Sequence, residues 1–277
     1  ANYYRAALGD VLFQALPVKL RNGESAVKND RTFWRITDLG KQALESGELK
    51  RAKKQIEVLN LLITQDLEKG NNEISSAIWS ALKGKDYVEE IIVPTEQKSW
   101  QQALGDEPLV NLDNRLTLNK QQALAFSQLL FQEGFNVWLL EGVTGSGKTE
   151  IYLQYIEEVL KKGKQVLVLV PEIGLTPQTV RRFQARFNVE IDVLHSNLND
   201  TQRLNVWERA RTGQSAIVIG TRSALFTQFS DLGLIILDEE HDGSFKQQDG
   251  WRYHARDLGI VLAQKLNICL LYTSPSP

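Results

Sequence analysis

Four continuous apolar runs of strand length, separated by stretches of helical character, constrain the fold of this chain more than any other feature. The runs occupy residues 137–140, 166–170, 217–219 and 234–237. A strand that is buried on both faces has this composition. Helices are predicted between the runs, and strands alternating with helices predict a parallel α/β sheet with right-handed crossovers. The predicted helices are residues 148–162, 176–187 and 200–211.

A glycine-rich loop follows the first apolar run and precedes the first of these helices. It reads GVTGSGKT and matches the phosphate-binding pattern G-x-x-x-x-G-K-S/T at every fixed position. Backbone N–H groups of such a loop wrap a phosphate, and the helix adds the positive end of its dipole. We expect Lys148 to hold the β- and γ-phosphates and Thr149 to ligate Mg²⁺. The expected nucleotide-binding residues of the loop are Gly142, Val143, Thr144, Gly145, Ser146, Gly147, Lys148 and Thr149.

The fourth apolar run ends in an acidic cluster, DEEHD at residues 238–242. In an open α/β sheet, ligands bind at the carboxyl ends of the strands. We expect Asp238 to hold Mg²⁺ through its water shell and Glu239 to polarise an attacking water, so that both act with Lys148 in catalysis. A solvated turn is the alternative for such a cluster, but the phosphate-binding loop upstream argues against it.

The first third of the chain has a different organisation. Helical periodicity at residues 56–63 and 74–82, followed by an extended segment at 86–93, predicts a winged-helix module. An excess of Lys and Arg near its start is compatible with phosphate contact, although a solvated face is the alternative, and such modules bind either DNA or protein. The predicted organisation is 1–22 as the end of a preceding domain, 23–93 as the winged helix, 94–116 as a linker, 117–267 as the nucleotide-binding lobe and 268–277 as a tail foreign to the fold.

The composition excludes several classes of protein. The 277 residues include one cysteine, three histidines and no methionine, and the net charge is −2. A single thiol forms neither an internal disulfide nor a Cys-rich zinc site, which indicates a cytosolic environment. No apolar run approaches the ~20 residues that span a bilayer, so we expect no membrane partner. The absence of methionine indicates a processed or truncated fragment.

Several motifs resemble the PriA family of replication-restart helicases within superfamily 2. The acidic cluster has the Asp-Glu-x-His form of that superfamily. The residues that carry the resemblance are GVTGSGKTE at 142–150, VPEIGLTPQ at 170–178, VLHS at 193–196, IGTRSALF at 219–226, DEEHD at 238–242, KQQDGWRYHARD at 246–257 and LGDVLFQALP at 8–17.

The resemblance implies an ATP-dependent 3′→5′ DNA helicase that acts in replication restart and primosome assembly. It implies a winged helix followed by the first RecA-like lobe, in an internal fragment that lacks the second motor lobe and the zinc insertion. ATP and Mg²⁺ are the implied cofactors, with zinc in intact members only, because this chain lacks its ligands. The implied partners are single-stranded and forked DNA, single-stranded-DNA-binding protein, and primosome and replicative-helicase-loading proteins, in a bacterial cytoplasm near the nucleoid.

The resemblance also assigns roles to residues outside the loop and the acidic cluster. Gln122 would read adenine, and His241 would couple the ATP site to the other lobe. Segments 171–176 and 220–223 would lie along single-stranded DNA. Segment 245–254 resembles an aromatic-rich loop, whose rings offer faces for base stacking, although aromatic residues also serve as core. The implied DNA-binding residues are Thr221, Arg222, Phe245, Lys246, Trp251, Arg252, Tyr253 and His254.

A departure from the family sequence leaves two other functions open. The family continues with Gly-Ser-Ala-Thr near residue 271, whereas this chain reads CLLYTSPSP from Cys269. One alternative is another P-loop ATPase or translocase, such as the RecG branch, which needs no aromatic loop. The other is a nucleotide-binding or DNA-binding module without turnover.

Overall fold

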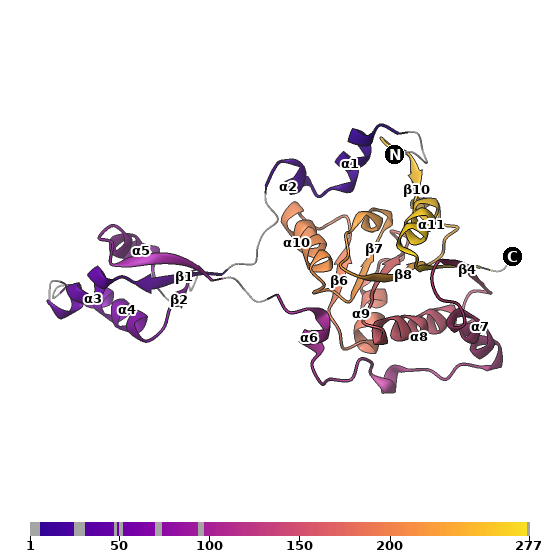
Figure 1. Cartoon of the computed structure of the whole chain (residues 1–277), viewed down its shortest axis with the longest axis horizontal. Helices are drawn as coiled ribbons and strands as arrows, with labels where there is room; N and C mark the ends of the chain where they lie inside the picture. Colours follow the sequence, from indigo (N-terminus) through magenta and orange to yellow (C-terminus); the bar gives the residue numbers. More distant parts are fainter. Residues whose placement is uncertain are drawn as a thin grey trace. The chain divides into compact units, whose positions relative to one another are not determined.

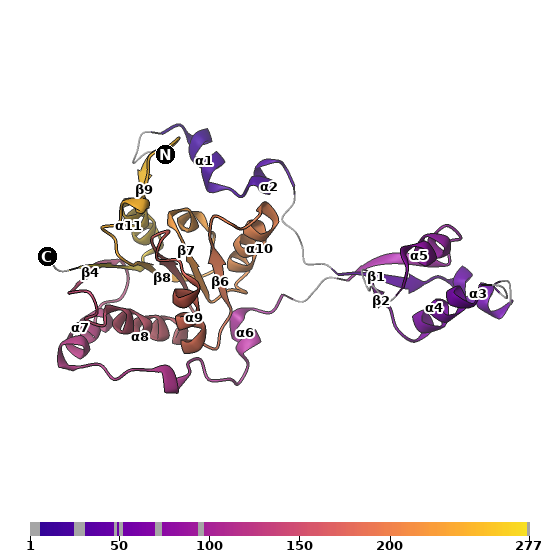
Figure 2. The same cartoon turned by 180° about the vertical axis from the view of Figure 1, so that it is seen from behind.

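The computed structural model describes residues 6–24, 31–46, 49, 52–69, 74–93 and 97–275. The chain forms two compact units, of which the smaller is Val27–Glu96 and the larger combines Ala1–Ala26 with Gln97–Pro277. Figures 1 and 2 show the chain from two opposite sides. Over the described ranges, no helix combines the length and the apolar character that crossing a membrane would require.

A six-stranded parallel sheet forms the centre of the larger unit. The four apolar runs lie in β4, β5, β7 and β8, which confirms the predicted parallel α/β sheet. In spatial order the strands are β4 (Asn136–Glu141), β11 (Cys269–Ser274), β8 (Leu232–Leu237), β5 (Gln165–Leu169), β7 (Ile217–Gly220) and β6 (Ile191–Leu194).

Helices cover both faces of this sheet, because successive side chains of a strand point to opposite faces. Val166 and Val168 of β5 pack in one apolar cluster with residues of α7 (Lys120–Leu130), α8 (Lys148–Lys161) and α9 (Pro177–Arg186). Leu167 and Leu169 pack in a second cluster with α10 (Asp200–Arg211) and α11 (Ala255–Leu266). Both views show the two layers on opposite sides of the sheet (Figures 1 and 2).

Polar caps set the starts of three of these helices. The side chains of Asn119, Thr176 and Asn199 each accept a hydrogen bond from the backbone N–H three residues later. Pro177 occupies the first turn of α9, where a missing N–H leaves no bond unmade. Local sequence signals therefore fix where α7, α9 and α10 begin.

The expectation that residues 268–277 are foreign to the fold is wrong for Cys269–Ser274. This segment is strand β11, which pairs with β4 on one side and β8 on the other. Leu270 and Leu271 are fully buried. The apolar start of the segment suits a central strand, and β4 and β8 each offer it an edge of unpaired backbone groups. Residues 276–277 lie outside the described residues.

The expectation of a linker at 94–116 is also wrong over residues 97–116, which we call the strap. Trp100 and Val110 are buried, and Val110 forms a β-bridge with Phe187. The Asn188 amide donates to the Pro108 carbonyl at 2.8 Å. Apolar anchors and the amide of Asn188, just after α9, thus hold a segment that has no periodic pattern. The strap contains α6 (Trp100–Leu104) and the 3₁₀ turn η1 (Leu112–Asn114), and residues 94–96 lie outside the described residues.

The smaller unit packs helices against an antiparallel sheet of order β2-β1-β3. Its core contains the stacked rings of Trp34 and Trp79, 5.0 Å between centroids, with Leu59 and Leu82 fully buried. The helices and the extended segment expected here are present, and the winged-helix assignment stays a prediction. The elements are β1 (Arg31–Ile36), α3 (Asp38–Glu45), α4 (Lys53–Thr64), β2 (Leu67–Glu68), α5 (Ser76–Lys83) and β3 (Val88–Val93).

Short elements complete the larger unit. The interpretation of residues 1–22 as the end of a preceding domain stays a prediction, and residues 1–5 lie outside the described ranges. The short elements are α1 (Leu8–Ala15), α2 (Val18–Arg21), η2 (Arg222–Phe226), η3 (Gly243–Phe245), β9 (Lys246–Gln247) and β10 (Tyr253–His254).

Candidate functional site

The loop at residues 142–149 joins the end of β4 to the start of α8, as predicted. Gly147 caps the helix with φ 83°, a left-handed conformation that side chains disfavour. A Cβ at Gly147 would lie 2.4 Å from the Gln122 Nε2 atom, and one at Gly142 would lie 2.8 Å from Ser146 Oγ. The loop therefore needs glycine at these positions for conformation and for space.

The Lys148 side chain folds back over this loop. Its ammonium donates to the carbonyl of Gly142, and also to that of Val143 at 3.2 Å. The first N–H groups of α8 have no partners within the helix and add positive potential at the same point. The loop thus combines a cation with a helix N-terminus, which is the arrangement that binds phosphate groups.

Strand β8 delivers Asp238 and Glu239 to the same edge of the sheet. The Asp238 carboxylate accepts hydrogen bonds from the Tyr152 hydroxyl at 3.1 Å and from Thr273 Oγ1 at 2.7 Å. The backbone N–H of Glu239 donates to Thr273 Oγ1 at 2.9 Å. Glu239 has φ 53°. This left-handed conformation costs about 1–2 kcal/mol in a residue with a side chain.

The loop and the acidic cluster line one cavity of about 800 Å³. Hydroxyl and carboxylate oxygens are the ligands that Mg²⁺ prefers, and both kinds are present here beside the Lys148 ammonium. The lining therefore fits a nucleotide phosphate with magnesium. The predicted residues that the structure brings together at this cavity are Thr144, Gly145, Ser146, Gly147, Lys148, Thr149, Asp238, Glu239 and His241.

Gln122 lies against the loop instead of in the cavity lining. Its Nε2 donates to the Ser146 carbonyl at 2.8 Å, and its Oε1 accepts from the Asn119 N–H at 2.9 Å. Both ends of the amide are therefore engaged, one with the phosphate-binding loop and one with the cap of α7. Recognition of adenine by Gln122 stays a prediction.

A separate groove of about 520 Å³ lies at the carboxyl ends of β5, β6 and β7. Glu172 and Thr176 come from the segment after β5, His195 follows β6, and Thr221 follows β7. The structure thus brings together the segments 171–176 and 220–223, which were predicted to lie along DNA.

Arg222 does not line this groove. Its guanidinium donates to the Ser244 carbonyl at 2.7 Å and to the Lys246 carbonyl at 3.4 Å, which fastens η2 to η3. Hydrogen bonds from Ser244 also lower the pKa of the Asp242 carboxyl that caps η3. The DNA contact of Arg222 stays a prediction, because the hydrogen bonds of this guanidinium in the structure are to backbone carbonyls.

The aromatic rings of segment 245–254 do not present open faces, contrary to the expectation. Phe245 is fully buried, and Trp251 and Tyr253 are 8% and 4% exposed. Phe226 packs against both of the latter rings, with centroid distances of 5.7 Å and 5.3 Å. Burial raises the pKa of Tyr253 to about 12. The rings form a small core because the apolar η2 turn lies beneath the β9–β10 hairpin.

The polar residues of the same segment divide into two groups. Lys246 and Arg252 are exposed, so their charges are available to a ligand. His254 instead caps α11, since its Nδ1 accepts from the Arg256 N–H at 3.2 Å. Burial lowers the pKa of His254, which favours the neutral form that this cap requires.

Two groups of buried polar residues near the loop were missed by sequence reasoning. Tyr152 is fully buried on α8 and contacts Asp238. Arg186 is 1% exposed and pairs with Glu150 at 2.9 Å, while its Nη1 donates to the Asn114 carbonyl at 2.7 Å. Glu150 directly follows Thr149, a spacing that could have drawn notice, but the sequence has no signal for its partner on α9.

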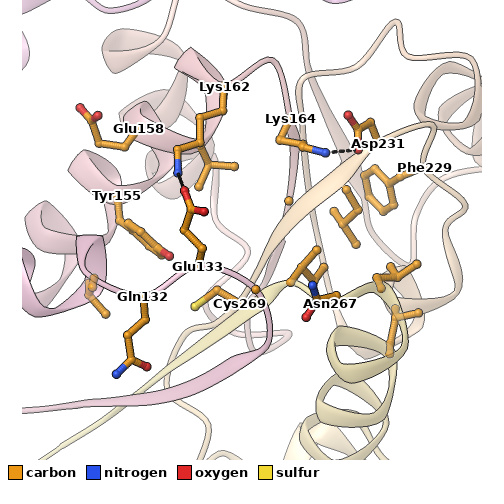
Figure 3. Close-up of a pocket in the computed structure, with 18 of the residues that line it drawn as sticks. Gln132, Glu133, Tyr155, Glu158, Lys162, Lys164, Phe229, Asp231, Asn267 and Cys269 are labelled. Atoms are coloured by element: carbon orange, nitrogen blue, oxygen red, sulfur yellow. Dashed lines mark hydrogen bonds and ion pairs between the residues drawn. The ribbon is translucent and has the colours of Figure 1, made fainter.

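The opposite, amino-terminal edge of the sheet holds another cavity, of about 740 Å³. Figure 3 shows Lys164 paired with Asp231, and Lys162 paired with Glu133, at 2.7 Å and 3.7 Å. Tyr155 also lines this cavity. None of the predicted site residues does so.

Comparison with known proteins places the site in a family context. A family model described as DEAD/DEAH box helicase matches residues 119–274, which is more than half of the chain. The Replication restart protein PriA of Haemophilus influenzae is 80% identical over 277 residues, which cover all of this chain and 38% of that protein. The protein of the same name from Bacillus subtilis is 37% identical over 256 residues, covering 87% of this chain and 30% of that protein.

A solved structure, the Pyrococcus furiosus Hef helicase domain, matches 61% of this chain and 35% of its own with 20% identity and a TM-score of 0.44. The chain thus spans well under half the length of the relatives it matches. The family match contains the phosphate-binding loop, the acidic cluster and all six strands of the parallel sheet. The chain belongs to the DEAD/DEAH box helicase family.

Proposed function

We propose that this chain provides the ATP-binding lobe of a 3′→5′ DNA helicase of the PriA type, which acts in replication restart and primosome assembly. The observation that supports this most directly is the shared cavity of the phosphate-binding loop and the acidic cluster. The 80% identity to the Haemophilus restart protein supports the choice of helicase type.

Each residue at the cavity has a role that follows from its chemistry. The Lys148 ammonium pairs with the β- and γ-phosphates of ATP, and the N–H groups of the loop hold the same oxygens. Thr149 and Asp238 hold Mg²⁺, which when bound neutralises charge on the phosphates. Glu239 accepts a hydrogen bond from the attacking water and orients it in line with the γ-phosphate. His241 couples the site to a second motor lobe.

Single-stranded DNA occupies the groove at the ends of β5, β6 and β7. Thr176 and Thr221 line this groove and offer hydroxyl and backbone groups to phosphates, which bind DNA without reading its sequence. The exposed Lys246 and Arg252 add positive charge on the β9–β10 hairpin. Forked DNA, single-stranded-DNA-binding protein, and primosome and replicative-helicase-loading proteins are further partners, in the bacterial cytoplasm near the nucleoid. Zinc belongs to an insertion elsewhere in the longer protein.

A chimera tests this proposal. The chain replaces the matched 38% of the Haemophilus protein, and ATP hydrolysis and unwinding of a forked duplex are measured with and without single-stranded DNA. We expect DNA-stimulated hydrolysis and unwinding within about threefold of the parent, because the matched segments are 80% identical. The Lys148→Ala chimera is the control and should lose both, since it removes the ammonium that lies over the loop carbonyls of Gly142 and Val143.

Two results would contradict the proposal. A folded chimera that hydrolyses ATP without stimulation by DNA would favour a different P-loop ATPase. A folded chimera that binds ATP but neither hydrolyses it nor unwinds DNA would identify a binding module without turnover.

A further inference from the structure

Tyr152 lies near both residues that are expected to hold magnesium. It lies three residues after Thr149 on α8. Its hydroxyl donates to Oδ2 of Asp238 at 3.1 Å, across 86 positions of sequence. A single phenol hydroxyl therefore lies between the phosphate-binding helix and the end of strand β8.

Packing alone does not account for a tyrosine at this position. The ring is 1% exposed and stacks on Phe183 at 6.4 Å, contacts that phenylalanine would make equally well. A buried hydroxyl destabilises the fold unless it is hydrogen-bonded. Its partner here is Asp238, one of the two expected metal ligands. The hydroxyl is thus specific to the site and not to the apolar core.

Tyr152 also completes the support of the Asp238 carboxylate. Thr273 donates to Oδ1 at 2.7 Å, and Tyr152 donates to Oδ2 at 3.1 Å. The two donors come from β11 and α8, on opposite sides of the carboxylate, so together they fix its rotation. Tyr152 does not itself line the nucleotide cavity.

We propose that Tyr152 is a positioning residue, whose hydroxyl holds the Asp238 carboxylate in one orientation beside the helix that carries Thr149, so that both can bind one magnesium ion. The inference rests on the proposed function, because it requires a magnesium-dependent nucleotide site. Residues that orient metal ligands in this way commonly change metal affinity by about 10–100-fold when altered. Tyr152 acts through Asp238 and touches neither nucleotide nor metal.

The test compares Tyr152→Phe with the unaltered 277-residue chain. Binding of N-methylanthraniloyl-ATP is followed by fluorescence, first in EDTA and then during a Mg²⁺ titration. We expect the half-saturating Mg²⁺ concentration to rise about tenfold, while affinity in EDTA changes less than twofold. Tyr155→Phe is the matched control, because Tyr155 is a buried tyrosine on the same helix that lines the opposite cavity (Figure 3). It should leave both values unchanged.

A double-mutant cycle with Asp238→Asn separates positioning from a general loss of structure. If Tyr152 acts through Asp238, its effect on Mg²⁺ dependence largely disappears in the Asp238→Asn background. An unchanged Mg²⁺ requirement in Tyr152→Phe would overturn the inference, and so would an equal loss of affinity in EDTA, which would assign a purely structural role. Absence of Mg²⁺-dependent nucleotide binding in the unaltered chain would refute the proposed function and this inference together.

Discussion

Replacing Arg186 by methionine should destabilise the larger unit strongly. Arg186 and Glu150 are 1% and 8% exposed, so the substitution leaves a buried carboxylate without its cation. Loss of one partner of a buried pair costs about 3–5 kcal/mol. We expect the lower value of about 3 kcal/mol, because Gln154 still donates to Glu150 at 2.8 Å. For a unit of this size that corresponds to a fall of roughly 6–12 °C in Tm.

Differential scanning calorimetry measures this shift, with the smaller unit as an internal reference because it contains neither residue. The matched control is Arg211→Met. Arg211 pairs with Glu208 at 2.7 Å, but its side chain is 46% exposed, so its loss should cost under about 1 kcal/mol.

The double variant Arg186→Met/Glu150→Met should recover more than half of the lost stability, since it removes the charge and the unmet carboxylate together. Equal destabilisation by Arg186→Met and Arg211→Met would refute this reasoning. A double variant less stable than Arg186→Met would do so as well.

Three further predictions concern the loop, the aromatic core and pH. Gly147→Ala should lower nucleotide affinity, and it should lower stability by at least about 1 kcal/mol. The reasons are that φ at this position is 83° and that Gln122 Nε2 would lie 2.4 Å from the new Cβ. Nucleotide-binding and melting curves measure the two effects. Trp251→Ala should cost about 3 kcal/mol by leaving a cavity beside Phe226; melting curves measure this loss, and a cost under about 1 kcal/mol would contradict the packing role. Burial lowers the pKa of His254 below its ordinary 6.5, so the unfolded state binds a proton at this residue more readily than the folded state does. The free energy of unfolding should therefore fall as the pH drops below about 6.5. His254→Asn should flatten that part of the profile of stability against pH, and an unchanged slope would contradict the assignment.

The sequence predicted those features whose determinants are local. The phosphate-binding loop has fixed spacing, and β5, β7 and β8 are buried on both faces, so their positions could be predicted before the structure was known. The apolar run in β4 also predicted a strand, but β4 lies at the sheet edge and exposes Val137 and Leu139, contrary to the expected burial of both faces. The Asp238–Glu239 pair could be placed at the ligand edge because it follows a strand in a parallel sheet.

Features that depend on distant neighbours were not predicted. Whether Cys269–Ser274 enters the sheet depends on the edges of β4 and β8, and its own residues do not reveal them. The strap has no periodicity, because single anchors such as Trp100 and the Asn188 amide hold it. The role of Tyr152 depends on its hydrogen bond to Asp238, which only the fold creates. Trp251 was predicted to stack on bases, but Phe226 packs against its ring.

The backbone conformation of Glu239 lowers stability, while its side chain is the one proposed to orient water at this site. Its φ of 53° is one that glycine adopts without strain and asparagine tolerates. Glu239→Gly should therefore relieve about 1 kcal/mol of conformational energy while removing the carboxylate that would orient water. A selection for thermal stability alone would discard the carboxylate that we propose orients the attacking water, and variants recovered from such a screen should be sequenced at this position first.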